Sequence, residues 1–147
     1  GAFFAVNAIG IIGATQVNAR LLRRVTIARL LNRGVTVCAI AGLATLAVGY
    51  ADFSTPWPIV ACWFVMMTSL GFVGANCSAR AMANQQPRAG SASALMGALQ
   101  FGTGSIAGSL VAALTASPLI GTPARAAGIA IAVFTIAGYA CSRQVAR

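Results

Sequence analysis

Five long runs of mostly apolar residues, each separated from the next by a short polar segment, limit what this chain can fold into. The hydrocarbon core of a bilayer is about 30 Å thick, so a helix that crosses it needs about 20 mostly apolar residues. Runs of this length are typical of transmembrane helices. We predict five membrane spans, at about residues 2–17, 35–50, 58–75, 92–116 and 124–141.

The small number of charged residues excludes a soluble domain. Of the 147 residues, 59% are hydrophobic and only 7% are charged, whereas a soluble domain carries about 25% charged residues. A chain with so few charges cannot cover a surface that faces water. The sequence therefore predicts an all-α, multi-pass transmembrane helical bundle whose surroundings are a lipid bilayer.

The arginines predict how the bundle is oriented in the membrane. Nine of the ten basic residues lie in the three segments that would share one side, at residues 20–33, 80–88 and 143–147, and only Arg125 lies on the other side with the single acid, Asp52. Because basic loops stay in the cytoplasm, this distribution predicts a cytoplasmic C-terminus. Nucleic acid is not an expected partner, since these arginines do not form a solvated basic face with aromatic residues between them.

The sequence offers little for catalysis or for metal binding. The four cysteines, Cys38, Cys62, Cys77 and Cys141, lie far apart, and there is no histidine and only one carboxylate. A metal cluster or a nucleophile with its base cannot be assembled from these side chains. We therefore expect no enzyme activity, no metal and no cofactor, and we interpret all four cysteines as small apolar residues of a packed interior.

A face of small residues runs along the fourth predicted span. Ser93, Gly97, Gln100, Gly104 and Gly108 fall at helical spacing and therefore share one side of a helix. Gly104 and Gly108 form a small-x-x-x-small pair, which predicts close packing against a neighbouring helix, and Gly97 extends this face. The Gln100 amide either faces a polar cavity or makes a helix–helix hydrogen bond of about 1 kcal/mol.

Three further residues are candidates for lining a substrate cavity. Asn7 in the first span has the same two interpretations as Gln100. Trp63 and Met67, with the neighbouring Met66, offer an adaptable apolar wall, although such residues are more often simple packing. Asn76 is instead expected to hold the loop that follows the third span.

Several motifs resemble one family. Residues 4–7 (FAVN), 18–24 (NARLLRR) and Asn76 with residues 81–82 match patterns in its eighth to tenth helices. Residues 87–101 (PRAGSASALMGALQF) are similar to its A-G-T-A-S-A-L-x-G-x-x-Q-F signature, with Ser91 in place of threonine. The chain thus resembles the C-terminal part of the Bcr/CflA drug-efflux transporters of the major facilitator superfamily.

The resemblance implies a partial major facilitator superfamily fold, about helices eight to twelve, with residues 1–147 as the C-terminal part of a transporter domain. It also implies proton-driven export of small apolar drugs, such as bicyclomycin or chloramphenicol, across a bacterial inner membrane by alternating access. The partners would then be drugs, protons and the missing N-terminal helices, which carry the proton-coupling residues. The alternative is a small five-span membrane protein with an accessory role and no transport of its own.

Three interpretations remain open for the arginine cluster at residues 20–33. The cluster sets the orientation of the bundle, or Arg20, Arg23 or Arg24 forms a cytoplasmic gate by binding a carboxylate or a helix C-terminus of the other half. In the third interpretation the cluster binds anionic lipid headgroups, at about 1 kcal/mol per arginine.

Overall fold

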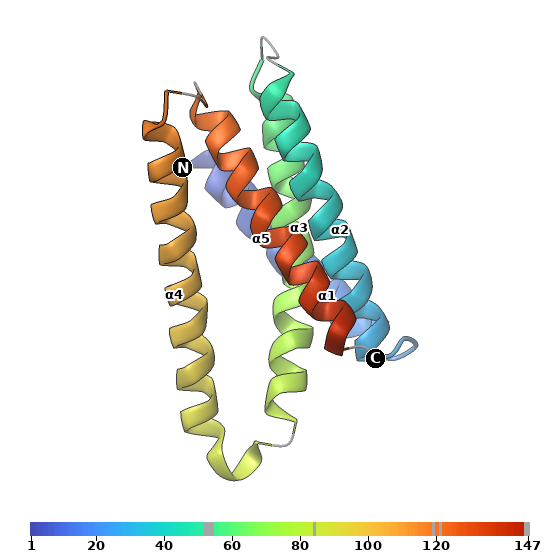
Figure 1. The fold of residues 1–147 in the computed structure, drawn as a ribbon. Coiled ribbons are helices and arrows are strands. Elements are labelled where there is room, and N and C mark those ends of the chain that lie inside the picture. The colour runs from blue at the N-terminus through green and yellow to red at the C-terminus, as the bar shows by residue number, and fades with distance from the viewer. Residues whose placement is uncertain (52–54, 84, 119, 121, 146–147) are drawn as a thin grey trace.

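The computed structural model describes residues 1–51, 55–83, 85–118, 120 and 122–145, and nearly all of them are helical. Five long α-helices follow one another, with one short 3-10 turn before the fourth (Figure 1). Their bounds are α1 Ala2–Leu21, α2 Ile27–Tyr50, α3 Trp57–Met82, η1 Gln86–Arg88, α4 Ala89–Ala116 and α5 Pro123–Val145.

This architecture confirms the predicted all-α, multi-pass bundle and is consistent with part of a major facilitator superfamily fold. Within the described residues, α2, α3, α4 and α5 are each long and apolar enough to cross a membrane, and α1 is 20 residues long. Each predicted span lies inside one of the five helices. Where the membrane begins and ends along each helix stays a prediction.

The helices extend further toward their arginine-bearing ends than the predicted spans. The predicted first span ends at about residue 17, and α1 continues beyond it to Leu21. The Asn18 side chain is buried and hydrogen-bonded to another helix, so its polarity does not break α1. Similarly, α2 begins at Ile27, which places Arg29 and Arg33 on the helix and not in a loop.

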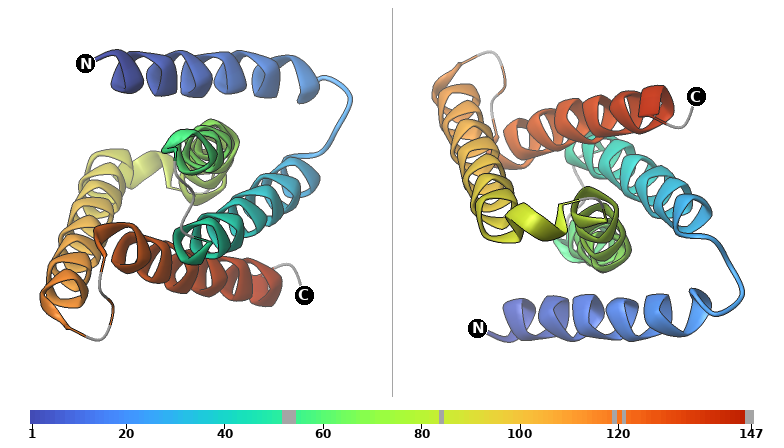
Figure 2. Two further views of the ribbon diagram at one scale, coloured as in Figure 1. Left: turned by 90° about the horizontal axis from the view of Figure 1, so that it is seen from above. Right: turned by 90° about the horizontal axis from the view of Figure 1, so that it is seen from below.

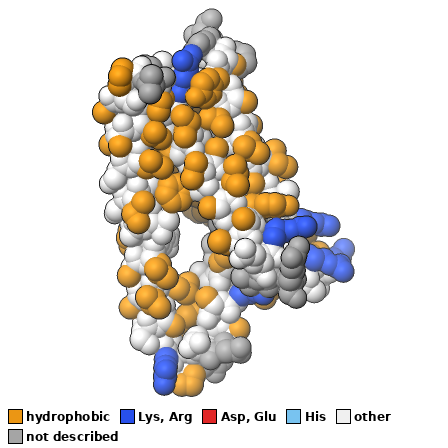
Figure 3. Space-filling view, in the orientation of Figure 1, with side chains coloured by type: hydrophobic (Ala, Val, Ile, Leu, Met, Phe, Trp, Pro, Cys, Tyr) orange, Lys and Arg blue, Asp and Glu red, His pale blue; other side chains and the backbone are white. Residues whose placement is uncertain are grey.

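The helices pack side by side, with α2 in contact with both α3 and α5. Seen from above and below, α3 lies between α1 on one side and α2 on the other, and α4 stands at the edge of the bundle (Figure 2). No described residue of α4 is buried. The space-filling view shows an opening between α4 and the other helices (Figure 3).

Small side chains make up most of the interior. Cys38, Ala41 and Met66 form a buried cluster, and Met67 and Ile131 pack against it. Our interpretation of the cysteines is therefore right for Cys38 but wrong for Cys77 and Cys141, which are exposed. Both exposed cysteines line a space between α2, α3 and α5 that none of the described residues fills.

Arginine side chains gather toward one end of the bundle. Figure 3 shows most of them at the lower end and one group at the top. At that upper end, the Arg125 guanidinium lies 5.3 Å from the centre of the Tyr50 ring, and the Trp57 ring meets Phe3 edge-on at 6.1 Å. Asp52, predicted at the same end, lies outside the described residues.

Candidate functional site

Two glycines lie at the contact between α1 and α3. A Cβ atom built on Gly71 would lie 2.7 Å from the Ile11 carbonyl oxygen and 2.8 Å from the Ala14 Cβ. A Cβ on Gly10 would lie 2.5 Å from the hydroxyl oxygen of Thr68. Gly71 therefore lets α3 approach the backbone of α1, and Gly10 leaves room for the Thr68 side chain.

A pair of buried amides joins the same two helices two turns further on. Asn76 is completely buried and Asn18 is 3% exposed. The Asn76 amide donates to Asn18 Oδ1 at 2.7 Å and to the Phe72 carbonyl oxygen at 2.8 Å, and Asn18 donates in return at 3.5 Å. Asn76 was expected to hold the loop, but its contacts show that it holds α1 against α3.

Two of the predicted cavity residues lie together. Asn7 on α1 and Trp63 on α3 line a pocket of about 250 Å³ with Phe3, Ile59 and Val60. Asn7 is half-buried, and the large faces of the pocket are aromatic and aliphatic. This combination of one amide with an apolar wall is suited to an uncharged, mostly apolar small molecule.

The other two predicted cavity residues lie elsewhere. Met67 packs against the buried cluster between α2, α3 and α5, so in this chain it contributes to the core. Gln100 is exposed on α4, and within the described part of the chain its side chain makes no hydrogen bond. The choice between a cavity and a helix–helix bond for Gln100 therefore stays open.

Among the described residues, no helix packs closely against the glycines of the small-residue face of α4. A Cβ atom built on Gly97, Gly104 or Gly108 would meet no atom of another described element within 4 Å. Gly108 nevertheless lines an apolar pocket of about 310 Å³ with Met66, Leu70 and Phe134. The close packing predicted at these three glycines is not made by the described residues and stays a prediction about other parts of the protein.

The three arginines that were predicted to form a gate lie where α1 ends and the connector to α2 begins. Arg20 is on the last turn of α1, Arg23 and Arg24 are in the connector to α2, and all three are exposed. No aspartate or glutamate lies in the described part of the sequence, so a gate would need a carboxylate from elsewhere. Across the described ranges, no three histidine, cysteine or acidic side chains lie close enough together to hold a metal ion.

Sequence reasoning missed the contacts between α1 and α3. Gly10, Ala14 and Asn18 recur every four residues, so they share one face of a helix. This row of two small residues and one amide is the pattern that would have predicted a tightly packed, hydrogen-bonded partner helix.

Comparison with known proteins gives one relevant similarity. The chain is 27% identical over 125 residues to the bicyclomycin resistance protein homolog of Haemophilus influenzae, an alignment that covers 83% of this chain and 31% of that protein. The chain therefore spans about a third of the length of the curated relative it matches. No protein-family model matches the chain, and no solved structure matches it.

Proposed function

We propose that this chain is the C-terminal part of a bacterial inner-membrane exporter that moves small apolar drugs out of the cell in exchange for protons. The observation that carries the proposal is the similarity to a resistance protein, because it extends over most of the chain. The cytoplasm would lie at the arginine-rich end, following the rule that basic loops stay inside.

Two features of the structure support this proposal. First, the pocket at Asn7 and Trp63 combines an amide with aromatic and aliphatic walls, as a site for an apolar drug requires. Second, α4 presents Gln100 and its glycine face without close contacts from the other described residues. Helices encoded upstream would cover that face and complete a cavity between the two halves of the transporter.

Proton coupling needs a titratable group within the membrane, and the upstream half would supply it. Among the described residues of this chain there is no carboxylate and no histidine for that role. This chain would contribute part of the cavity wall and the cytoplasmic arginines. Arg20, Arg23 and Arg24 would close the inner side in one state by binding acceptor groups of the other half.

A proton-gradient-dependent efflux assay tests the proposal. Cells would express the chain alone or joined to the spans encoded upstream, and we expect gradient-dependent export only from the joined form. Gln100→Ala should lower export or change which drugs are moved. Thr103→Ala is the matched control on the same helix, because its hydroxyl is already bonded to the Leu99 carbonyl oxygen.

Absence of export from both forms would contradict the proposal. If this chain then still accumulated stably in the membrane, a small accessory membrane protein would become the better description. If Gln100→Ala exports drugs as well as the unchanged chain does, the transporter proposal stands, but Gln100 does not line its cavity.

A further inference from the structure

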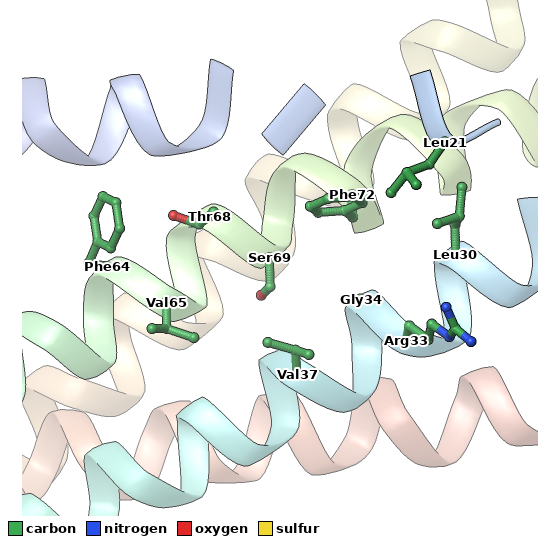
Figure 4. Close-up of a pocket in the computed structure, with 10 residues that line it drawn as sticks. All are labelled: Leu21, Leu30, Arg33, Gly34, Val37, Phe64, Val65, Thr68, Ser69 and Phe72. Atoms are coloured by element: carbon green, nitrogen blue, oxygen red, sulfur yellow. The ribbon is translucent and has the colours of Figure 1, made fainter. Parts of the chain in front are cut away.

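A groove lies in the wedge between α1 and α2, with α3 as its back wall. Its volume is about 340 Å³. Figure 4 shows Phe64 and Val65 at one end, Val37 and Phe72 along its length, and Leu21 with Leu30 at the other end. Of the two hydroxyls on its α3 wall, that of Ser69 donates to the Met66 carbonyl oxygen of its own helix at 2.6 Å, and that of Thr68 is buried without a hydrogen-bond partner among the described residues. The other side chains of the wall between Phe64 and Val37 are hydrocarbon.

One end of the groove is cationic. The Arg33 guanidinium lies at the end that Leu21 and Leu30 form (Figure 4). Arg29 is one turn earlier on α2, and Arg23 and Arg24 are in the connector that closes the same end of the wedge. All four arginines are exposed, and the described residues include no carboxylate to neutralise them.

The groove opens sideways, toward the surroundings of the bundle. Val37 and Val65 at its mouth are 43% and 45% exposed. Both belong to helices that are long and apolar enough to cross a membrane, so within the described residues nothing separates this mouth from surrounding lipid. An occupant must be apolar along most of its length and anionic at the end that meets Arg33.

The shape and the charge of the groove together indicate its occupant. From Phe64 to Phe72 it follows about eight residues of α3, or about 12 Å at 1.5 Å per residue. A neutral drug would leave the cationic end unused. A hydrocarbon chain with an anionic head matches both the apolar length of the groove and its cationic end.

We propose that this groove binds an anionic phospholipid, with one acyl chain against Val37, Val65 and Phe72 and the phosphate held by Arg33. The lipid would hold α1 and α2 at a fixed separation on the cytoplasmic side, because it fills the wedge that their side chains leave open. This proposal rests on the membrane-spanning helices and not on drug export.

Photo-crosslinking of the purified full chain in detergent tests the site. The probes are phosphatidylglycerol and phosphatidylcholine that carry the same diazirine-bearing acyl chain. We expect phosphatidylglycerol to label α2 and α3 around Val37 and Val65, and Arg33→Gln to weaken its binding about five-fold, the effect of one arginine near a membrane surface. Arg33→Lys should keep most of the binding.

Two variants separate the groove from general attraction to a basic surface. Arg143→Gln removes a charge from the same end of the bundle on α5, away from the groove, and should leave the labelling unchanged. Val65→Trp places a large side chain at the mouth and should abolish labelling in the groove by both lipids. Circular dichroism on each variant checks that the helices remain folded.

Several results would overturn the proposal. Equal labelling of the groove by the two lipids would show an apolar crevice without selectivity for anionic lipid. If Arg33→Gln binds phosphatidylglycerol as strongly as the unchanged chain does, Arg33 does not hold the phosphate. Displacement of the probe by an apolar drug, but not by unlabelled phosphatidylglycerol, would make the groove a drug site. Since no transport is measured, a negative efflux assay would not affect this result.

Discussion

Gly71 on α3 and the glycines on α4 look alike in sequence and differ in the structure. Gly71 on α3 lies against the backbone of α1, at distances that a Cβ atom could not occupy. Gly104 and Gly108 on α4 have the more conspicuous four-residue spacing, yet a Cβ built on either would meet no other described element within 4 Å. Gly71 therefore packs closely against another described helix, whereas Gly104 and Gly108 do not.

The difference shows what small-residue spacing can and cannot predict. Spacing shows that a helix presents a surface on which another backbone can approach closely. It does not identify the partner, since that depends on which helices the fold places alongside. The amide side chains differ in the same way. Asn18 and Asn76 hydrogen-bond to each other between α1 and α3, whereas Gln100 is exposed on α4.

The largest effect is expected when the tight crossing is forced apart. Gly71→Leu would place a side chain against the Ile11 carbonyl oxygen and Ala14, which cannot move without shifting the whole of α1. Overpacking of this kind costs about 1–3 kcal/mol, and we expect a value near the upper limit because backbone must move. Unfolding of the full chain by SDS in mixed micelles measures the loss.

Gly74→Leu is the matched control for that measurement. It lies on the same helix and gains the same helix propensity, up to about 1 kcal/mol, but a Cβ there meets nothing within 4 Å. The difference between the two variants isolates the packing contribution. Equal stabilities would contradict the close approach of α1 and α3.

A smaller effect is expected from the buried amide pair. Asn76→Ala removes the hydrogen bonds to Asn18 and leaves the Asn18 amide buried without its partner, which should destabilise the chain by about 1 kcal/mol. The double variant with Asn18→Ala should cost less than the sum of the two single variants, because both remove the same interaction. Additive losses in the same SDS titration would mean that the two amides do not interact.

Ser78→Ala serves as the reference for this pair. Ser78 is exposed on the same helix, half a turn beyond Asn76, so its replacement should change the unfolding free energy by less than about 0.5 kcal/mol. A loss as large as that of Asn76→Ala would point to a general sensitivity of this end of α3 and not to the amide pair.

The all-α class and the five helices could be predicted because hydropathy over about 20 residues is a property of local sequence. The exact end of α1 could not, since Asn18 looks like a helix end until Asn76, 58 residues away, supplies its hydrogen bonds. The candidate site divides in the same way. Asn7 and Trp63 meet because α1 and α3 pack together. Met67 takes the packing role that is more common for such residues, whereas nothing in the sequence predicted that Gln100 would be exposed.

The smallest effect on this chain is expected at Gly104. Gly104→Leu adds a side chain where the described residues leave open space, so we expect the unfolding free energy to change by less than about 0.5 kcal/mol beyond the gain in helix propensity. In the form joined to upstream helices, the same variant should reduce drug efflux, since close packing of another helix on this face requires a small residue.

Gly102→Leu provides the comparison on the opposite face of α4, where a Cβ also meets nothing within 4 Å. Two residues advance a helix by about 200°, so the two variants add the same side chain to nearly opposite sides. If an upstream helix packs on the face of Gly104, only Gly104→Leu impairs efflux. Gly104 would then allow close helix packing in the whole transporter, as Gly71 of α3 does within this chain. Normal efflux by both variants would mean that α4 keeps its small face open in the whole transporter as well, and that these glycines serve something other than helix packing.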